Sequence, residues 1–285
     1  MSWLLKLNNF FLNSNLFISA CVVALCQSSA ILLNVEVSHL MPFVFFSTLF
    51  SYNFQRFVRF NTSKNGFKQL EWFKEQERSI KSITVIAFFL TIYFSFFLLW
   101  KSLVILIPAV AITVLYPLNF QFSSRNMQLR EMPRLKIFWI VSVWTLVSVL
   151  LVASESGFSF STEIWLLLAS RFCFVLALTI PFDIRDLKYD KSSMKTIPQL
   201  FGVEKSKQLA LISLAFFELT AIVHYIVADF SFYFLLALLF TSLYVGILVY
   251  KTNEERKETF YTFWLEGSSL LMCFLLFISH WLLVS

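Results

Sequence analysis

The chain has 285 residues, of which 58% are hydrophobic and only 14% are charged, and its mean hydropathy is +0.74. A water-soluble domain of this length has too little interior to bury so much apolar surface, which excludes the ordinary soluble classes. The formal net charge of +6 does not indicate nucleic-acid binding, because the basic residues follow the pattern of membrane-protein loops. We therefore expect an all-α polytopic membrane protein, since a bilayer accepts helices that are apolar on every side.

Apolar runs divide the chain into about nine segments that are each long enough to cross a bilayer, which takes roughly 20 residues. Only Lys101 and Ser102 separate the third segment from the fourth, and one long helix there would leave eight spans. No stretch between the segments is long enough for a second core, so we expect one transmembrane domain over residues 1–285. The predicted spans are 12–33, 39–58, 80–99, 102–118, 136–153, 162–182, 208–228, 231–250 and 262–284.

The distribution of basic residues predicts the orientation. If the first span starts in the cytoplasm, the loops on that side carry 21 of the 23 Lys and Arg residues, while Lys101 lies opposite and Arg171 lies within a span. This positive-inside pattern predicts a cytoplasmic N-terminus and an external C-terminus. The basic loops near 56–81 and 183–207 emerge on one face, where they can attract an anionic group such as a phosphate. The lack of an organelle-specific extension favours the bacterial inner membrane.

Three aspartates follow the sixth span. The spacing of Asp183, Asp186 and Asp190 places them on one side of a helix that continues past the span, close enough to share a cation. Carboxylates in this arrangement suit magnesium, which typically takes one or two of them together with phosphates of a substrate. The alternative is a solvated loop helix in which Arg185 and Lys188 balance the acids.

The run from Asp183 to Leu209, DIRDLKYDKSSMKTIPQLFGVEKSKQL, resembles the second aspartate-rich motif of the UbiA-type prenyltransferase superfamily. The resemblance implies nine helices around a central cavity, with the motif at the cytoplasmic end of the sixth. It also implies transfer of an isoprenoid from a prenyl diphosphate to a lipophilic or aromatic acceptor, with magnesium as cofactor. The matching features are the three aspartates, Lys195, Thr196-Ile197-Pro198, Phe201-Gly202, Tyr116-Pro117 after the fourth span, and the basic segment from Arg125 to Lys136.

The chain departs from the family at the end of the second span, where a first aspartate-rich motif is usual. No Asp or Glu occurs between Glu36 and Glu71, and Asn53 is the one remaining oxygen ligand there, while Arg56 takes a ligand position. This departure predicts one magnesium ion on the three aspartates rather than two ions. Arg suits direct binding of a diphosphate, because its planar group pairs with phosphate oxygens. The residues predicted to contact the diphosphate are Asn53, Arg56, Arg130, Arg134, Lys136 and Lys188.

Two hypotheses follow, and the sequence leaves open whether the chain is an enzyme. The first is a divergent prenyltransferase that uses the remaining acidic cluster. The second is a non-catalytic relative that binds an isoprenoid or a membrane lipid, or that serves as a subunit of a membrane complex. The loss of one metal-binding cluster is expected where catalysis is no longer required. No feature indicates nucleic acid as a partner.

Charged residues within the spans form a separate group. Arg171 and Glu218 fall near the middle of the sixth and seventh spans, and we expect them to pair as an architectural contact. Glu266, near the cytoplasmic end of the ninth span, is expected to face the cavity. Glu36 and Glu155 lie in or beside the outer loops and are expected to be solvated.

Overall fold

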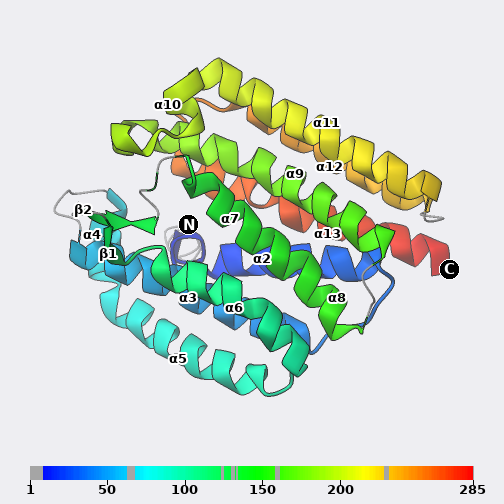
Figure 1. The fold of residues 1–285 in the computed structure, drawn as a ribbon, viewed down its shortest axis with the longest axis horizontal. Coiled ribbons are helices and arrows are strands. Elements are labelled where there is room, and N and C mark those ends of the chain that lie inside the picture. Colours follow the sequence, from blue (N-terminus) through cyan, green and yellow to red (C-terminus); the bar gives the residue numbers. More distant parts are fainter. Residues whose placement is uncertain are drawn as a thin grey trace, which may run out of the picture.

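The computed structural model describes residues 9–62, 68–122, 125–129, 132, 134–157, 161–227 and 231–284. Its long helices run side by side along the longest axis of the molecule (Figure 1). Each predicted span coincides with one of them: α2 (Leu16–Leu32), α3 (Leu40–Thr62), α5 (Glu77–Ser95), α6 (Trp100–Leu115), α7 (Lys136–Thr145) with its extensions, α9 (Thr162–Arg185), α11 (Val203–Val227), α12 (Phe232–Lys251) and α13 (Ser268–Val284). The all-helical fold class is therefore confirmed, apart from one short hairpin.

Two of the helices contain wider, π-helical turns. After α7, the π-helical segment η2 (Leu146–Leu151) and α8 (Val152–Glu155) continue the same rod. The π-helical segment η5 (Phe260–Leu265) precedes α13. Such turns are rare and often occur at functional sites, and both segments contribute a residue to the cavity described below, Val147 and Thr262.

Six of the described helices are long and apolar enough to cross a membrane: α5, α7 with its extensions, α9 with the turn after it, α11, α12, and η5 with α13. Helices α2 and α6 are apolar but shorter. Large apolar side chains face outward, with Phe89 63%, Ile107 61% and Phe240 61% exposed, as expected of surfaces that contact lipid. The protein is therefore integral to a membrane, while the number of crossings and their direction stay predictions.

The connections at the two ends of the bundle differ in size. Helix α4 (Lys68–Glu75), strands β1 (Asn119–Phe122) and β2 (Arg125–Gln128), and helix α10 (Ile197–Phe201) gather at one end, on the left in Figure 1. Helix α2 begins at this end, and α13 ends at the other. The strands form an antiparallel hairpin that pairs Asn119 with Gln128, which the sequence pattern did not predict.

At the opposite end of the bundle, the expectation that Glu155 is solvated is wrong. Its side chain is 1% exposed, and one carboxylate oxygen lies 2.9 Å from His39 Nε2. The other oxygen accepts the backbone N–H of Leu99 at 2.9 Å, just before α6 begins. Glu155 thus joins the start of α6 to the segment before α3, whereas Glu36 is exposed as expected.

Candidate functional site

The three predicted aspartates converge on a lysine. The ammonium nitrogen of Lys136, at the start of α7, lies 2.9 Å from Asp183 Oδ1, 2.5 Å from Asp190 Oδ2 and 3.8 Å from Asp186 Oδ2. The side chains of Lys136, Asp183 and Asp190 are 7%, 3% and 3% exposed. Burial of Asp183 and Asp190 is unfavourable unless a cation offsets their charge, and the ammonium supplies one positive charge between them. Within the described ranges, no three His, Cys, Asp or Glu side chains are grouped as ligands for a metal ion.

The backbone around the aspartates differs from the predicted continuing helix. Helix α9 ends at Arg185, and a 3₁₀ turn over Asp186–Lys188 follows it. Helix α10 then fixes the position of Asp190, because the Gln199 side chain donates to the carbonyl of Asp190 at 3.2 Å. The three carboxylates therefore meet through a turn and a side-chain anchor rather than through one helical face.

The solvated-helix alternative pairs Arg185 and Lys188 with the aspartates, and in the described residues only Arg185 contacts one of them. Arg185 Nε donates to Asp186 Oδ1 at 2.8 Å, and its Nη1 donates to Glu258 Oε1 at 2.7 Å. The guanidinium also lies over the ring of Phe182, 4.9 Å from the ring centroid. Lys188 is more than half exposed and lies 3.9 Å from a carboxylate oxygen of Glu254, so it does not approach the buried acids.

Three further residues predicted to bind a diphosphate, Asn53, Arg56 and Arg134, form hydrogen bonds to parts of the chain other than the three aspartates. Asn53 is fully buried, and its side chain pairs with Asn15 at 2.8 Å instead of facing the cavity. Arg56 lines the cavity and donates to Asn15 Oδ1 at 2.8 Å and to the carbonyl of Asn13. Arg134 is exposed, and its backbone N–H bonds to the loop after α9. Arg130 lies outside the described residues.

The structure explains what replaces the missing first motif. Asn15 has a left-handed backbone conformation (φ 68°), which Asn tolerates better than most residues, and it forms the turn before α2. Two polar side chains in the second half of α3, Asn53 and Arg56, hold this turn in place. This part of α3 therefore anchors the chain and supplies no carboxylate to the cavity.

Arg171 and Glu218 are not paired in the part of the chain that the structure describes, contrary to expectation. The guanidinium of Arg171 donates to the carbonyl of Leu25 at 3.2 Å and to Ser29 Oγ at 3.0 Å, both on α2. Glu218 instead lines a shallow groove between α11 and α12. Their sequence positions placed both residues near mid-span, but they could not show which neighbour each faces.

A cavity of about 520 Å³ connects the acidic cluster to the interior of the bundle. At one end it is lined by Asp183, Asp186 and Lys136, and Glu266 also reaches it, as predicted. Most of the remaining wall is aliphatic or aromatic. Its apolar members include Val22, Phe43, Phe50, Phe88, Ile92, Leu106, Ile140, Val143, Val175 and Leu178.

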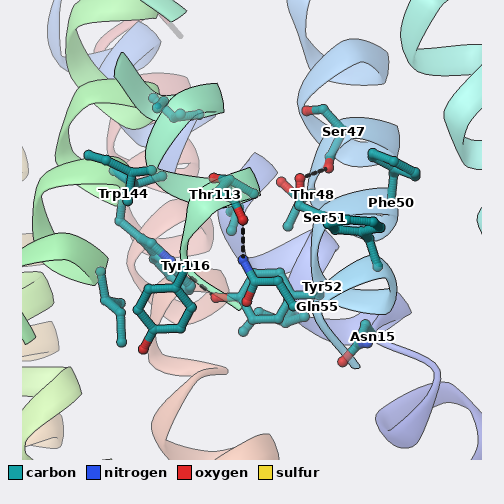
Figure 2. Close-up of a pocket in the computed structure, with 18 of the residues that line it drawn as sticks. Asn15, Ser47, Thr48, Phe50, Ser51, Tyr52, Gln55, Thr113, Tyr116 and Trp144 are labelled. Carbon is teal, nitrogen blue, oxygen red and sulfur yellow. Dashed lines mark hydrogen bonds between the residues drawn. The ribbon is translucent and has the colours of Figure 1, made fainter. Parts of the chain in front are cut away.

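One polar surface inside this cavity was not predicted. Ser47, Thr48, Ser51, Tyr52 and Gln55 of α3 all line it, and we call these five residues the α3 shelf. Figure 2 shows the shelf facing Thr113 and Trp144, with the hydrogen bonds from Gln55 to Thr113 and from Trp144 to Tyr52. The five residues of the α3 shelf have helical spacing within an otherwise apolar span, and this sequence signal could have revealed the polar surface.

The chain resembles solved membrane proteins over most of its length. A UbiA homologue from Aeropyrum pernix K1 superposes with a TM-score of 0.67 at 13% identity, over 92% of this chain and 98% of that one. A UbiA homologue from Archaeoglobus fulgidus, solved bound to GPP and Mg²⁺, gives 0.60 at 13% identity, over 94% and 99%. A digeranylgeranylglyceryl phosphate synthase gives 0.60 at 14% identity, over 96% and 98%. No curated protein sequence matches the chain.

At these identities the structural matches establish the fold alone. The family assignment comes from the sequence model of the UbiA prenyltransferase family, which matches residues 76–282. The matched region begins next to α5 and includes all three aspartates and Lys136, whereas α2 and α3 lie before it. With most of its length matched by that model, the chain belongs to the UbiA prenyltransferase family.

Proposed function

We propose that the chain binds a prenyl diphosphate in the cavity and transfers the isoprenoid to a lipophilic or aromatic acceptor. One observation carries this proposal: a compact group of ionisable side chains and a long apolar wall share one cavity of about 520 Å³. That volume lies within the range of small-molecule sites, roughly 300–1,000 Å³. A prenyl diphosphate has the same division between a charged head and an apolar chain.

The chain's own residues would divide the work along the cavity. The apolar wall, including Phe43, Phe50 and Leu178, would hold the isoprenoid and exclude water, so that an allylic cation meets the acceptor and not a water molecule. At the charged end, Lys136 is the cation already placed among the acids, and its ammonium can donate to a phosphate oxygen while keeping Asp190. Arg185 is held beside the same end by Asp186 and Glu258.

The residues present fit one magnesium ion and not two. Asp183 and Asp186 both line the cavity and offer the hard oxygen ligands that magnesium prefers, together with phosphate oxygens of a substrate. On the α3 side, Asn53 is buried against Asn15 and no carboxylate is present for a second ion. When bound with the diphosphate, magnesium would supply neutralisation of the leaving group.

A second function is favoured by the position of Lys136. Its ammonium already offsets part of the charge of the buried acids, so the cluster contains a cation that the chain itself supplies. A non-catalytic relative that binds an isoprenoid or a lipid in the cavity would need nothing more. Such a protein could also act as a subunit of a membrane complex, with the acids kept for stability.

The location proposed for either function is the bacterial inner membrane, with the charged end of the cavity at the cytoplasmic side. The support is the positive-inside pattern of the sequence. Helix α4, the hairpin of β1 and β2, and helix α10, which lie in or beside the basic segments, gather at one end of the bundle (Figure 1), and α9 ends at Arg185, beside the aspartates in sequence.

Release of diphosphate separates the two functions. Purified protein would be incubated with geranyl or geranylgeranyl diphosphate and an acceptor panel, with magnesium or with EDTA. If the chain is an enzyme, we expect diphosphate release to depend on magnesium. Asp183→Asn and Asp186→Asn should each reduce its rate by about 100-fold, the scale of losing one electrostatic contact to a leaving group. Glu204→Gln is the matched control, because Glu204 is an exposed acid at the start of α11. If the chain binds the prenyl diphosphate but releases no diphosphate under any condition, non-catalytic binding becomes the proposed function in place of prenyl transfer.

A further inference from the structure

A groove of about 400 Å³ runs between α11 and α12, apart from the central cavity. None of the residues that line the groove also lines the cavity, so the two spaces are separate. Exposed apolar side chains border the groove, among them Leu211, Leu243 and Ile247. Both helices are long and apolar enough to cross a membrane, so we expect the groove to open toward lipid.

Glu218 places a carboxylate in this groove. It lies in the middle of the predicted span 208–228 and is partly exposed. Within the described residues, Glu218 forms no hydrogen bond and no ion pair. An ionisable side chain at this depth is unfavourable, and in membrane proteins it usually pairs with another charged or polar group. The carboxylate therefore points to a partner outside this chain.

Ser242 is a second polar group of the groove. It lies on α12 and is 3% exposed, and its hydroxyl forms no hydrogen bond within the part of the chain that the structure describes. The adjacent Thr241, which does not line the groove, donates its hydroxyl proton to the carbonyl of Ala237 at 2.8 Å. A carboxylate and a hydroxyl group are thus both available to whatever occupies the groove.

The small residues of the groove leave room for a helix. Ser242 and Gly246 are four residues apart, so they lie on one face of α12, and Ala215 lines the groove from α11. Small residues at this spacing let two membrane helices approach closely. A lipid tail would fill the same space, but it has no group that donates to Glu218 or Ser242. A transmembrane helix supplies both close packing and a polar side chain.

The charge of Glu218 indicates which helix fits. A cation at the same depth compensates a carboxylate most strongly, because little water competes there. A second copy of this chain brings no such cation. Arg171 is the one Lys or Arg near the middle of a predicted span, and it is 2% exposed and bonds to α2. The cation therefore belongs to a different membrane protein.

We propose that the groove between α11 and α12 docks a transmembrane helix of another protein, and that this helix carries a lysine or an arginine near its midpoint. The cation would pair with Glu218, while the helix packs against Ser242 and Gly246. Because the groove is separate from the cavity, the proposal rests neither on prenyl transfer nor on binding of a prenyl diphosphate.

Synthetic peptides test the proposal on the full chain in phosphatidylcholine liposomes. The probe is a transmembrane peptide of about 20 leucines with one central lysine, and matched peptides carry a central leucine or a central glutamate. Association would be measured by energy transfer between the labelled chain and each labelled peptide. The lysine peptide is expected to associate about tenfold more tightly than the leucine peptide, the scale of one polar contact between membrane helices. The glutamate peptide should show no such gain.

Two variants locate the contact. Glu218→Leu should remove the preference for lysine. Gly246→Leu should weaken association by filling the groove, since the first atom added at position 246 meets its nearest neighbours, Leu211 and Leu214, at ordinary distances of 3.8 and 3.9 Å. Ala111→Leu is the matched control, because it adds the same side chain to an exposed position on α6.

The wild-type comparison is decisive even if a variant fails to fold. Equal association of the lysine and leucine peptides would overturn the proposal, and so would a preference for lysine that persists in Glu218→Leu. Self-association of the chain that Glu218→Leu abolishes, with no preference among the peptides, would assign the groove to a second copy and reject the cationic helix. Glu218→Leu should leave diphosphate release unchanged, so failure of prenyl transfer and failure of helix docking are distinguishable.

Discussion

Lys136 is the residue whose position most changes the interpretation of the sequence. As a basic residue before the fifth span, it was predicted to meet a diphosphate directly. Its ammonium instead lies between Asp183 and Asp190, where it compensates the two most buried carboxylates of the cluster. One cation of the chain thereby does part of the work expected of a metal ion, and it remains close enough to the cavity to meet a ligand.

Replacement of Lys136 should destabilise the protein and make it respond to magnesium. Lys136→Met leaves Asp183 and Asp190 buried without a cation, which should lower the free energy of unfolding by about 3–5 kcal/mol. Millimolar magnesium should recover part of this loss, because the acids then accept the metal ion. Thermal unfolding in detergent, with and without magnesium, measures both effects.

Lys188→Met is the control, since Lys188 is more than half exposed and its 3.9 Å contact with Glu254 contributes about 1 kcal/mol or less. If magnesium stabilised Lys136→Met no more than the wild type, the acids would not form a cation site, and a metal-dependent function would lose its support.

Single positions also show how far the sequence could predict the site. The local spacing of Asp183, Asp186 and Asp190 was enough to group them, although the helix ends between the first and the second. Lys136 and Asn15 come from distant parts of the chain, so no local pattern could place them beside Asp190 and Asn53. Contacts of that kind depend on how whole helices pack.

At the scale of elements, hydropathy located the helices well because each span is a long apolar run. The hairpin of β1 and β2 was missed, since strands of four residues in a polar loop carry little periodic signal. The polar face of α3 was also missed, although Ser47, Ser51 and Gln55 follow the spacing of a helix. A search of each span for polar positions on one face would have detected it.

The junction at Glu155 gives a prediction at this scale. Glu155→Ala removes the acceptor of the Leu99 N–H before α6 and the partner of His39 before α3. Because the carboxylate is 1% exposed, its loss leaves buried polar groups unsatisfied, and the free energy of unfolding should fall by about 1–3 kcal/mol. Thermal unfolding provides the measurement.

The matched control is Glu36→Ala, which removes an exposed acid from the same end of the bundle and should change stability by less than about 0.5 kcal/mol. Equal effects of the two substitutions would show that Glu155 does not connect these helices.

At the scale of the whole molecule, the fold brings residues from three helices together around one cavity. The end of α9 brings the aspartates, α7 brings Lys136 and Trp144, and α3 brings the shelf. In the family resemblance, α3 and α9 each supply an acidic cluster, whereas here α3 supplies neutral polar groups and an anchor for the turn before α2. This asymmetry is the basis for proposing one magnesium ion and not two.

The most direct test of the central claim is an experimental structure of the full chain with magnesium and a non-reactive thio analogue of geranyl diphosphate. We predict density for the diphosphate within hydrogen-bonding distance of Lys136, and for the geranyl chain along the apolar wall of the cavity. Lys136 should also remain beside Asp190. A cavity that contains no ligand density, or an analogue bound with its diphosphate away from Lys136 and Asp183, would contradict the account.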